Sequence, residues 1–294
     1  MVVPLQTDKS GFSSIMRLLL CAQLMLLALT AYATGQDGDV IYINGERLQL
    51  LGKPICLDST LYHTLKDKLP SSRPKVTSNW DGFTAYWSIN NDKLYLDSVR
   101  CEAYDPNVKA LVGESIPSET LYRIFNRYSA SNQITASWVS GKFRVAKGEV
   151  IYYQHTGFER YYEEETILNI KNGEVIEMNA YHNFVKDGFA FDKPQQNEAQ
   201  EMLHKILPLH IERYPELAHV KRLIFTVKRA RLDEKGNLLE CDVKVVRPDV
   251  NPQLATEIAE ALKTYHPWKV YFINGEYRAL GIENWVIPYV LHDK

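Results

Sequence analysis

Residues 239–265 read LECDVKVVRPDVNPQLATEIAEALKTY, and the spacing of their apolar residues changes midway. Up to Val245, apolar and charged residues alternate, which is the period of a strand with one buried and one solvated face. Asn251 then supplies a helix N-cap, and Pro252 suits the first helical position. The stripe that follows predicts a helix packed on a sheet, with a buried face of Leu254, Ile258, Ala261, Leu262 and Tyr265.

Apolar runs on both sides of this stretch predict the other strands of the same domain. One lies at 223–227, before turn-forming residues at 233–237. Two more lie at 268–273 and 282–291, with Asn274-Gly275 as a turn between them. An amphipathic helix at 199–206 precedes them and should end at Pro208, which lacks a backbone donor. We therefore expect residues 198–294 to form a small two-layer α+β domain.

The C-terminal stretch from about 220 to 291 resembles the TonB C-terminal domain family. The resemblance implies a two-layer fold with an antiparallel sheet, and binding of an extended peptide by strand addition. Family members usually carry tryptophan before proline at the helix exit, so Pro267-Trp268 departs from the pattern. The resemblance depends on a combination: Phe225 and Val227, the 233–236 turn, the alternating strand with Cys241, Val243 and Val245, the helix start at 251–254, Pro267-Trp268, Gly275 and the closing strand 287–290.

Residues 39–180 show the alternation and turns of a mainly antiparallel β-rich domain, and they carry no such resemblance. The runs 41–43 and 48–50 flank Asn44-Gly45, a dipeptide that tolerates the positive φ of a tight hairpin turn. One short helix is predicted at 118–128. Residues 181–197 lack periodicity and are interpreted as a linker. Further strand-like runs lie at 85–89, 94–96, 134–139, 142–145, 150–154, 166–170 and 175–178.

Arg17 precedes an apolar run at 18–30 that ends in Ala31-Tyr32-Ala33, the arrangement of a secretory signal peptide. The small residues Ala31 and Ala33 suit a signal peptidase, so we expect residues 1–33 to be removed. The run is shorter than the roughly 20 residues of a bilayer span, and an uncleaved inner-membrane anchor is the alternative. The prediction is an exported bacterial envelope protein, periplasmic or secreted.

The cysteine spacing does not predict a metal site or a redox pair. Cys21 lies inside the apolar run, away from the position of a lipidated cysteine. The remaining Cys56, Cys101 and Cys241 form no CxxC motif. An oxidising compartment permits one disulfide, and Cys56 with Cys101 is the favoured pair because both lie in the β-rich domain. Three free thiols are the alternative.

Composition and motif searches narrow the function. Lys and Arg number 34 against 36 Asp and Glu, so a net charge of -2 offers no positive field to nucleic acid. No metalloprotease, α/β-hydrolase, P-loop or dinucleotide spacing is present, and no cofactor is expected. Ser72 and Lys75 match the spacing of penicillin-interacting enzymes, but Pro74 disfavours the helix they would need. We interpret Glu163-Glu164-Glu165 as a solvated strand edge. An enzymatic activity is not indicated, although it stays open.

Aromatic residues are concentrated in the β-rich domain. Half or more must belong to the core or to cross-strand pairs. The remainder could line a groove for a glycan or a peptide, and no spacing selects which. The aromatic residues concentrated in this domain are Trp80, Tyr86, Trp87, Tyr95, Tyr152, Tyr153, Tyr161 and Tyr162.

Three functions remain open. The leading hypothesis is a noncatalytic envelope protein that binds an extended peptide or another protein along the last strand of the C-terminal sheet. The second is an energy-transducer variant anchored in the inner membrane, although the 13 prolines are scattered and form no spacer. The third is a hydrolase with an unrecognised site. Pro288 within the last strand cannot donate and is equally suited to prevent pairing. The candidate partner-binding residues are Trp285, Val286, Ile287 and Tyr289.

Overall fold

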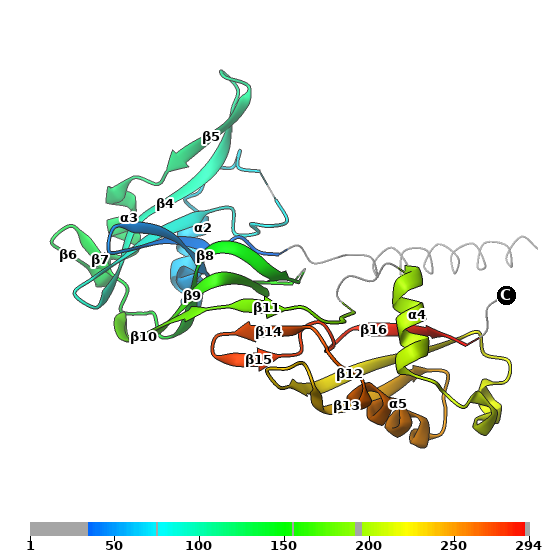
Figure 1. The fold of residues 1–294 in the computed structure, drawn as a ribbon. Helices are drawn as coiled ribbons and strands as arrows, with labels where there is room; N and C mark the ends of the chain where they lie inside the picture. The colour runs from blue at the N-terminus through cyan, green and yellow to red at the C-terminus, as the bar shows by residue number, and fades with distance from the viewer. Residues whose placement is uncertain (1–34, 75, 155, 192–195, 292–294) are drawn as a thin grey trace, which may run out of the picture.

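The computed structural model describes residues 35–74, 76–154, 156–191 and 196–291. The predicted signal segment, including Ala31 and Ala33, lies outside the described residues. The described chain is a mixed α+β protein dominated by strands, which form two large sheets in succession along the sequence (Figure 1). The predicted α+β class is therefore confirmed. Among the described helices, none is long and apolar enough to cross a bilayer.

The first sheet is almost entirely antiparallel and curls on itself. Its strands are β1 (Asp39–Ile43), β2 (Glu46–Leu51), β3 (Thr84–Asn90), β4 (Lys93–Asp105), β5 (Ala110–Ser115), β6 (Ser129–Ala130), β7 (Gln133–Thr135), β8 (Gly141–Tyr153), β9 (Arg160–Lys171) and β10 (Glu174–His182). They follow the order β10-β9-β8-β2-β1-β3-β4-β7-β6, and β5 pairs with β4. Glu174 of β10 also pairs with Lys93 of β4, which brings distant parts of the order together. Asn44 and Gly45 have positive φ in the β1–β2 turn, as predicted.

Two short helices contribute to the core of this first domain. The predicted helix at 118–128 is present as α3 (Ser118–Ile124), followed by one 3₁₀ turn (Asn126–Tyr128). The second, α2 (Ser59–Lys66), was not predicted. The Asp58 carboxylate caps it by accepting hydrogen bonds from the backbone N–H groups of Thr60 and Leu61. Leu61 and Leu65 of α2 then enter the core around Trp87.

The second sheet has the predicted succession of strand, strand, helix and further strands. It comprises β11 (Phe184–Lys186), β12 (Arg222–Leu232), β13 (Leu238–Arg247), β14 (Val270–Ile273), β15 (Glu276–Arg278) and β16 (Val286–Val290), with α4 (Gln196–Ile206) and α5 (Pro252–Thr264). The order is β11-β14-β15-β12-β13, and β16 pairs with β12. Asn251 caps α5 as predicted. The predicted helix stripe is confirmed, because Leu254, Ile258 and Leu262 are fully buried against a sheet that includes Phe225 and Ile287.

A nearly continuous strand connects the two sheets. β10 ends at His182, β11 begins at Phe184, and only Asn183 lies between them. β10 pairs with β9 in the first sheet, whereas β11 pairs with β14 in the second. The rings of Phe189 and Phe191 pack at a tilt against Trp268 in the second core. Much of the stretch 181–197, interpreted from sequence as a linker, thus contributes strand and core to both domains.

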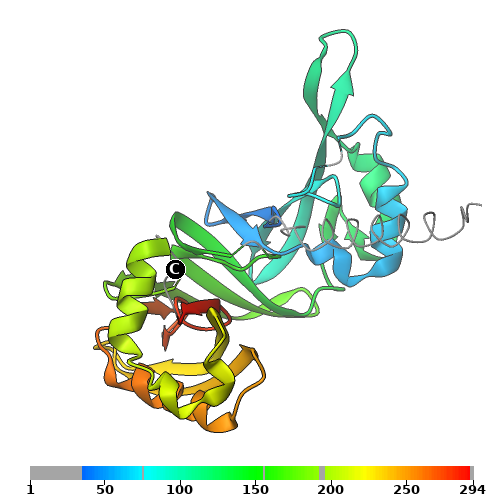
Figure 2. The same cartoon turned by 90° about the vertical axis from the view of Figure 1, so that its right-hand side faces the viewer.

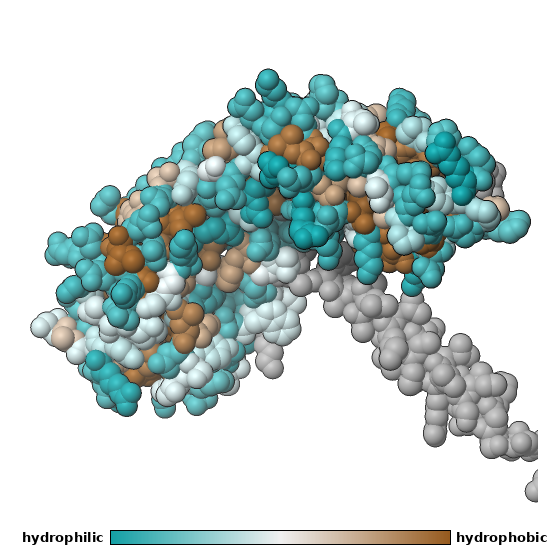
Figure 3. All heavy atoms as spheres, turned by 90° about the horizontal axis from the view of Figure 1, so that it is seen from below, coloured by the Kyte–Doolittle hydropathy of each residue, from teal (hydrophilic) through white to brown (hydrophobic). Residues whose placement is uncertain are grey.

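The hairpin of β4 and β5 extends from the first sheet as an arm. Both ribbon views show it projecting away from the rest of the molecule (Figures 1 and 2). All six residues of β5 are exposed. Apolar side chains elsewhere on the surface form separate patches in the face drawn in Figure 3.

Candidate binding site at the domain junction

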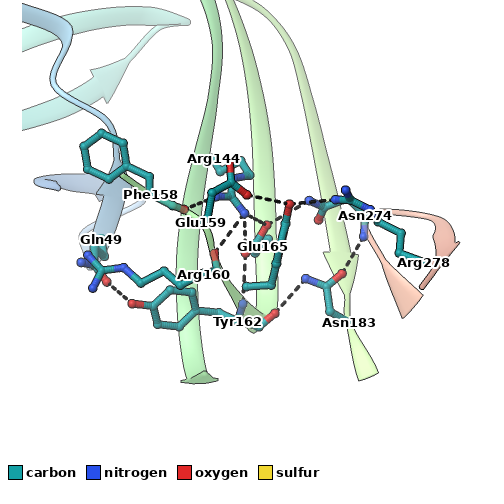
Figure 4. Close-up of polar contacts among 11 residues, drawn as sticks. Gln49, Arg144, Phe158, Glu159, Arg160, Tyr162, Glu165, Asn183, Asn274 and Arg278 are labelled. Atoms are coloured by element: carbon teal, nitrogen blue, oxygen red, sulfur yellow. Dashed lines mark hydrogen bonds and ion pairs between the residues drawn. The ribbon is translucent and has the colours of Figure 1, made fainter. Parts of the chain in front are cut away.

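Glu165 of β9 is buried where the two sheets meet, and its carboxylate is fully hydrogen bonded (Figure 4). Its side chain is 0% exposed. Arg144 Nη1 of β8 lies 3.3 Å from each carboxylate oxygen. The backbone N–H of Tyr162 donates to Oε1 at 3.0 Å, and Asn274 Nδ2 from the second domain donates to Oε2 at 3.0 Å. These donors meet the hydrogen-bonding needs of the buried carboxylate and link both domains.

Asn183, the residue between β10 and β11, also bonds to both domains. Its Nδ2 donates to the carbonyl of Tyr162 at 2.8 Å. Its Oδ1 accepts from the backbone N–H of Asn274 at 2.8 Å. Arg144 completes the network by donating to the carbonyls of Phe158 and Arg160. The two domains are therefore joined by side-chain hydrogen bonds as well as by the continuous backbone.

A layer of tyrosines packs beside this polar network. Tyr152 and Tyr161 from the β8–β9 hairpin form one apolar cluster with Tyr271 of β14, together with Ile273 and Leu280. Arg278 Nη1 donates to the Tyr161 hydroxyl at 2.7 Å. The guanidinium groups of Arg144 and Arg278 lie 4.5 and 5.4 Å from the centre of the Tyr161 ring. The contacts of Arg278 therefore hold the β8–β9 hairpin against the second domain, whereas the Arg144–Tyr161 contact lies within the hairpin.

A groove opens next to the tyrosine layer. It has a volume of about 420 Å³ and is lined from both domains. Val150 and Tyr153 on one side, and Val185 on the other, leave much of their apolar surface exposed. Asp187 and Lys269 add opposite charges to the lining. Aromatic and aliphatic walls with a few polar groups are typical of ligand-binding clefts. The aromatic lining residues are Tyr152, Tyr153, Tyr271 and Trp285.

The structure separates the four candidate partner-binding residues by position. Trp285 lines the groove, and its indole N–H donates to the carbonyl of Leu280. Ile287 and Tyr289 are buried and belong to the second core. Val286 is 66% exposed. The groove therefore includes one of the four candidates, and sequence reasoning did not identify the groove because its walls come from distant segments.

The outer edge of β16 is covered by helix α4. One side of β16 pairs with β12. On the other side, Gln200 Nε2 donates to the carbonyl of Pro288 at 2.5 Å, and Gln200 Oε1 accepts from the N–H of Val290 at 3.0 Å. His204 Nε2 lies 2.7 Å from the carbonyl oxygen of Val290. The Gln200 side chain thus bonds to one outward carbonyl and one outward N–H of β16, as a neighbouring strand would. Pro288 has no N–H, so it removes one of the remaining outward donors.

The three described cysteines are free thiols. Cys56 is exposed and Cys101 is buried, so the structure has the free-thiol alternative rather than the Cys56–Cys101 bridge. Although part of the Cys56 residue is exposed, desolvation of its sulfur by neighbouring groups, with the charge of Asp81 nearby, raises the pKa of this thiol to about 12. Such a thiol is protonated at neutral pH and is a poor nucleophile.

A second buried ion pair lies inside the first domain. Lys53 Nζ is 3.0 Å from Asp39 Oδ1. Trp87 Nε1 and the N–H of Ala85 also donate to the Asp39 carboxylate, and Lys53 donates to the carbonyl of Phe83. Burial raises the pKa of Asp39, and the Lys53 charge opposes that shift. Every group has a partner, so this cluster stabilises the β1–β3 packing.

The remaining sequence candidates do not assemble into a site. The interpretation of Glu163 to Glu165 as a solvated edge is wrong for Glu165, because Arg144 from the paired strand neutralises it in the interior. Lys75, needed for the Ser72 motif, lies outside the described residues. Within the described ranges, no group of three or more His, Cys, Asp or Glu side chains is placed to hold a metal ion.

The junction groove is thus the strongest candidate site in the described chain. Comparisons with protein-family models, with curated proteins and with solved structures find no match for this chain.

Proposed function

We propose that this chain is an exported, noncatalytic binding protein that holds an extended peptide in the groove between its two domains. The observation that carries the proposal is the groove itself, in which tyrosine, tryptophan and valine side chains from both domains form one lining. Export is proposed from the segment at 17–33, whose arrangement is that of a signal peptide.

The lining favours a peptide over a sugar. Sugars stack on flat aromatic faces and need many polar partners, whereas the exposed Val150 and Val185 suit aliphatic side chains. Tyrosine and tryptophan supply large contact areas with few rotatable bonds, so they lose little entropy on binding. The two charges, on Asp187 and Lys269, provide an orientation for an extended backbone.

The junction network supports this function by holding both walls in place. A groove formed by two domains binds tightly only if their relative orientation costs little to fix. Glu165, Asn183 and Asn274 fix it before any ligand arrives. The resemblance of the C-terminal domain to the TonB family motivates a peptide ligand. Because α4 covers the outer edge of β16, we place that peptide in the groove instead of on the strand edge.

A phage-displayed library of random peptides tests the proposal. Peptides selected on the purified protein should bind it in solution, and Trp285→Ala should weaken them by about tenfold or more, as expected for a buried aromatic anchor. Val150→Ser, at an exposed position of the groove, should weaken them by a smaller factor.

Trp80→Ala is the matched control, because Trp80 is 70% exposed on the first domain and does not line the groove. It should leave the affinity unchanged. Circular dichroism establishes that each variant is folded. Selected peptides that bind Trp285→Ala and Val150→Ser as tightly as the native protein would place the binding surface elsewhere.

A further inference from the structure

The outer edge of β5 is an open strand edge on an arm that projects from the molecule (Figure 1). Within the described part of the chain, β5 pairs only with β4, over the register from Arg100↔Ser115 to Asp105↔Ala110. An unpaired edge exposes N–H and C=O groups that readily pair with another strand. The segment carries no proline, and 110–113 carries no charge.

The hydrogen bonds of the arm show which backbone groups point outward. The N–H of Ile116 donates to the carbonyl of Val99, so this pair faces inward between β4 and β5. The N–H of Tyr104 instead donates to the carbonyl of Ser72, on the far side of β4. Because the direction alternates along a strand, the residue paired with Tyr104 also points away from β4. The outward residues of β5 are therefore Leu111, Gly113 and Ser115.

Gly113 at the centre of this edge is not required by the monomer. Its φ is not in the left-handed region, and a Cβ added there would meet nothing within 4 Å. Glycine weakens a strand and is expected where another backbone approaches closely. No such backbone within the described chain contacts the outer edge of β5. A backbone approaching this edge would therefore come from outside the described residues.

We propose that β5 pairs with β5 of a second copy of this chain, antiparallel about a two-fold axis at Gly113. Leu111 then lies opposite Ser115 of the second copy, and Gly113 lies opposite itself. Each outward N–H and C=O group of these three residues finds a partner. An isologous contact of this kind needs a self-complementary edge, and the symmetric spacing of the outward residues around Gly113 provides one.

The charges along the arm fit the same arrangement. The register places Lys109, at the tip of one arm, opposite residue 117 of the other. That position lies between Glu114 and Glu119, at the base of the second arm. Lys109 at each tip therefore lies nearer to acidic residues of the second copy than to the second Lys109, although Asp105 shares the tip, whereas a parallel in-register pairing would place the two Lys109 side chains opposite each other. Exposed Tyr104 and Leu111, which share one face of the arm, add apolar surface on that face.

Disulfide trapping tests the register directly. Antiparallel residues that exchange both hydrogen bonds lie about 5.5 Å apart at Cα, which is within the range for a disulfide. In a Cys56→Ser background, Gly113→Cys should form a covalent dimer in oxidised glutathione. Lys109→Cys is the control, because the two copies of residue 109 would lie about 26 Å apart at ~3.3 Å per residue. It should remain monomeric under the same conditions.

Sedimentation over a concentration series tests the association without cross-linking. The native protein should show a reversible monomer–dimer equilibrium, weak because the edge contact is small. Gly113→Pro removes an outward N–H without removing a bond to β4, and it should weaken dimerisation by about tenfold or more. Lys109→Glu should also weaken it, and adding Glu114→Lys should restore it. A native protein that stays monomeric throughout, with Gly113→Cys no faster to cross-link than Lys109→Cys, would overturn the proposal.

Discussion

Strands β16 and β5 both have one side that pairs with no other strand in the described chain, and the two unpaired edges differ in how they are covered. Gln200 and Pro288 cover or remove the outward groups of β16, and its alternate side chains are buried in the second core. β5 has none of these features, and its residues are exposed on an arm that projects from the molecule. The difference is the one expected if β5 pairs with a second copy of the chain, as proposed above.

The largest expected effect comes from a charge placed under the guarded edge. Leu203 of α4 is 1% exposed in the second core, so Leu203→Asp should lower the free energy of unfolding by about 4 kcal/mol or more. The matched change on the open edge is Leu111→Asp, at a residue that is 51% exposed. It should change the free energy of unfolding by no more than about 0.5 kcal/mol. Urea denaturation measures both, and similar losses in the two variants would erase the distinction between the edges.

A smaller effect is expected when only the covering hydrogen bonds are removed. Gln200→Ala deletes two bonds to β16 and should cost about 1 to 3 kcal/mol. The amide hydrogen of Val290, which is hydrogen bonded to Gln200 Oε1 in the native protein, should also exchange faster with solvent. Gln253→Ala is the control, because Gln253 is an exposed glutamine on α5. If Val290 exchanges at the native rate in Gln200→Ala, the side-chain amide does not protect that edge.

The smallest effect is expected at Pro288. The N atom of this residue points away from β12, so Pro288→Val should change stability by less than about 1 kcal/mol. In a Gly113→Pro background, where β5 is blocked, Pro288→Val alone should remain monomeric because Gln200 still covers the edge. Combining it with Gln200→Ala should produce concentration-dependent association, measured by sedimentation. A combined variant that stays monomeric would show that β16 is kept from pairing by something other than these two residues.

Local sequence patterns predicted the elements that local energetics determine. The alternation before Val245, the Asn251 cap and the stripe containing Ile258 each reflect neighbouring residues, and each is present in the structure. Helix α2 had comparable signals in Asp58, Leu61 and Leu65, but a β-rich interpretation of the surrounding sequence obscured them. Its short length also offers only one turn of periodicity beyond the cap.

The site could not be read in the same way, because its residues meet only through long-range pairing. Glu165 is followed by ordinary strand residues, and nothing near it indicates that it is buried. Its partners are Arg144 on the adjacent strand and Asn274, 109 residues away. The groove likewise joins Tyr153, at the end of β8 in the first sheet, with Trp285, which directly precedes β16 of the second sheet. Strand register within each sheet fixes such contacts, and single-sequence periodicity does not.

The strand shared through Asn183 has a consequence for inheritance. A domain whose strands all come from its own stretch of chain can be duplicated, lost or fused to another protein without disrupting either fold. Here a cut at the end of β10 would leave the first half intact, whereas a cut after residue 197 would deprive the second half of β11 and of the aromatic contacts of Phe189 and Phe191. The unit that recombination can move without loss is therefore either the whole two-sheet body or a C-terminal piece beginning near residue 183.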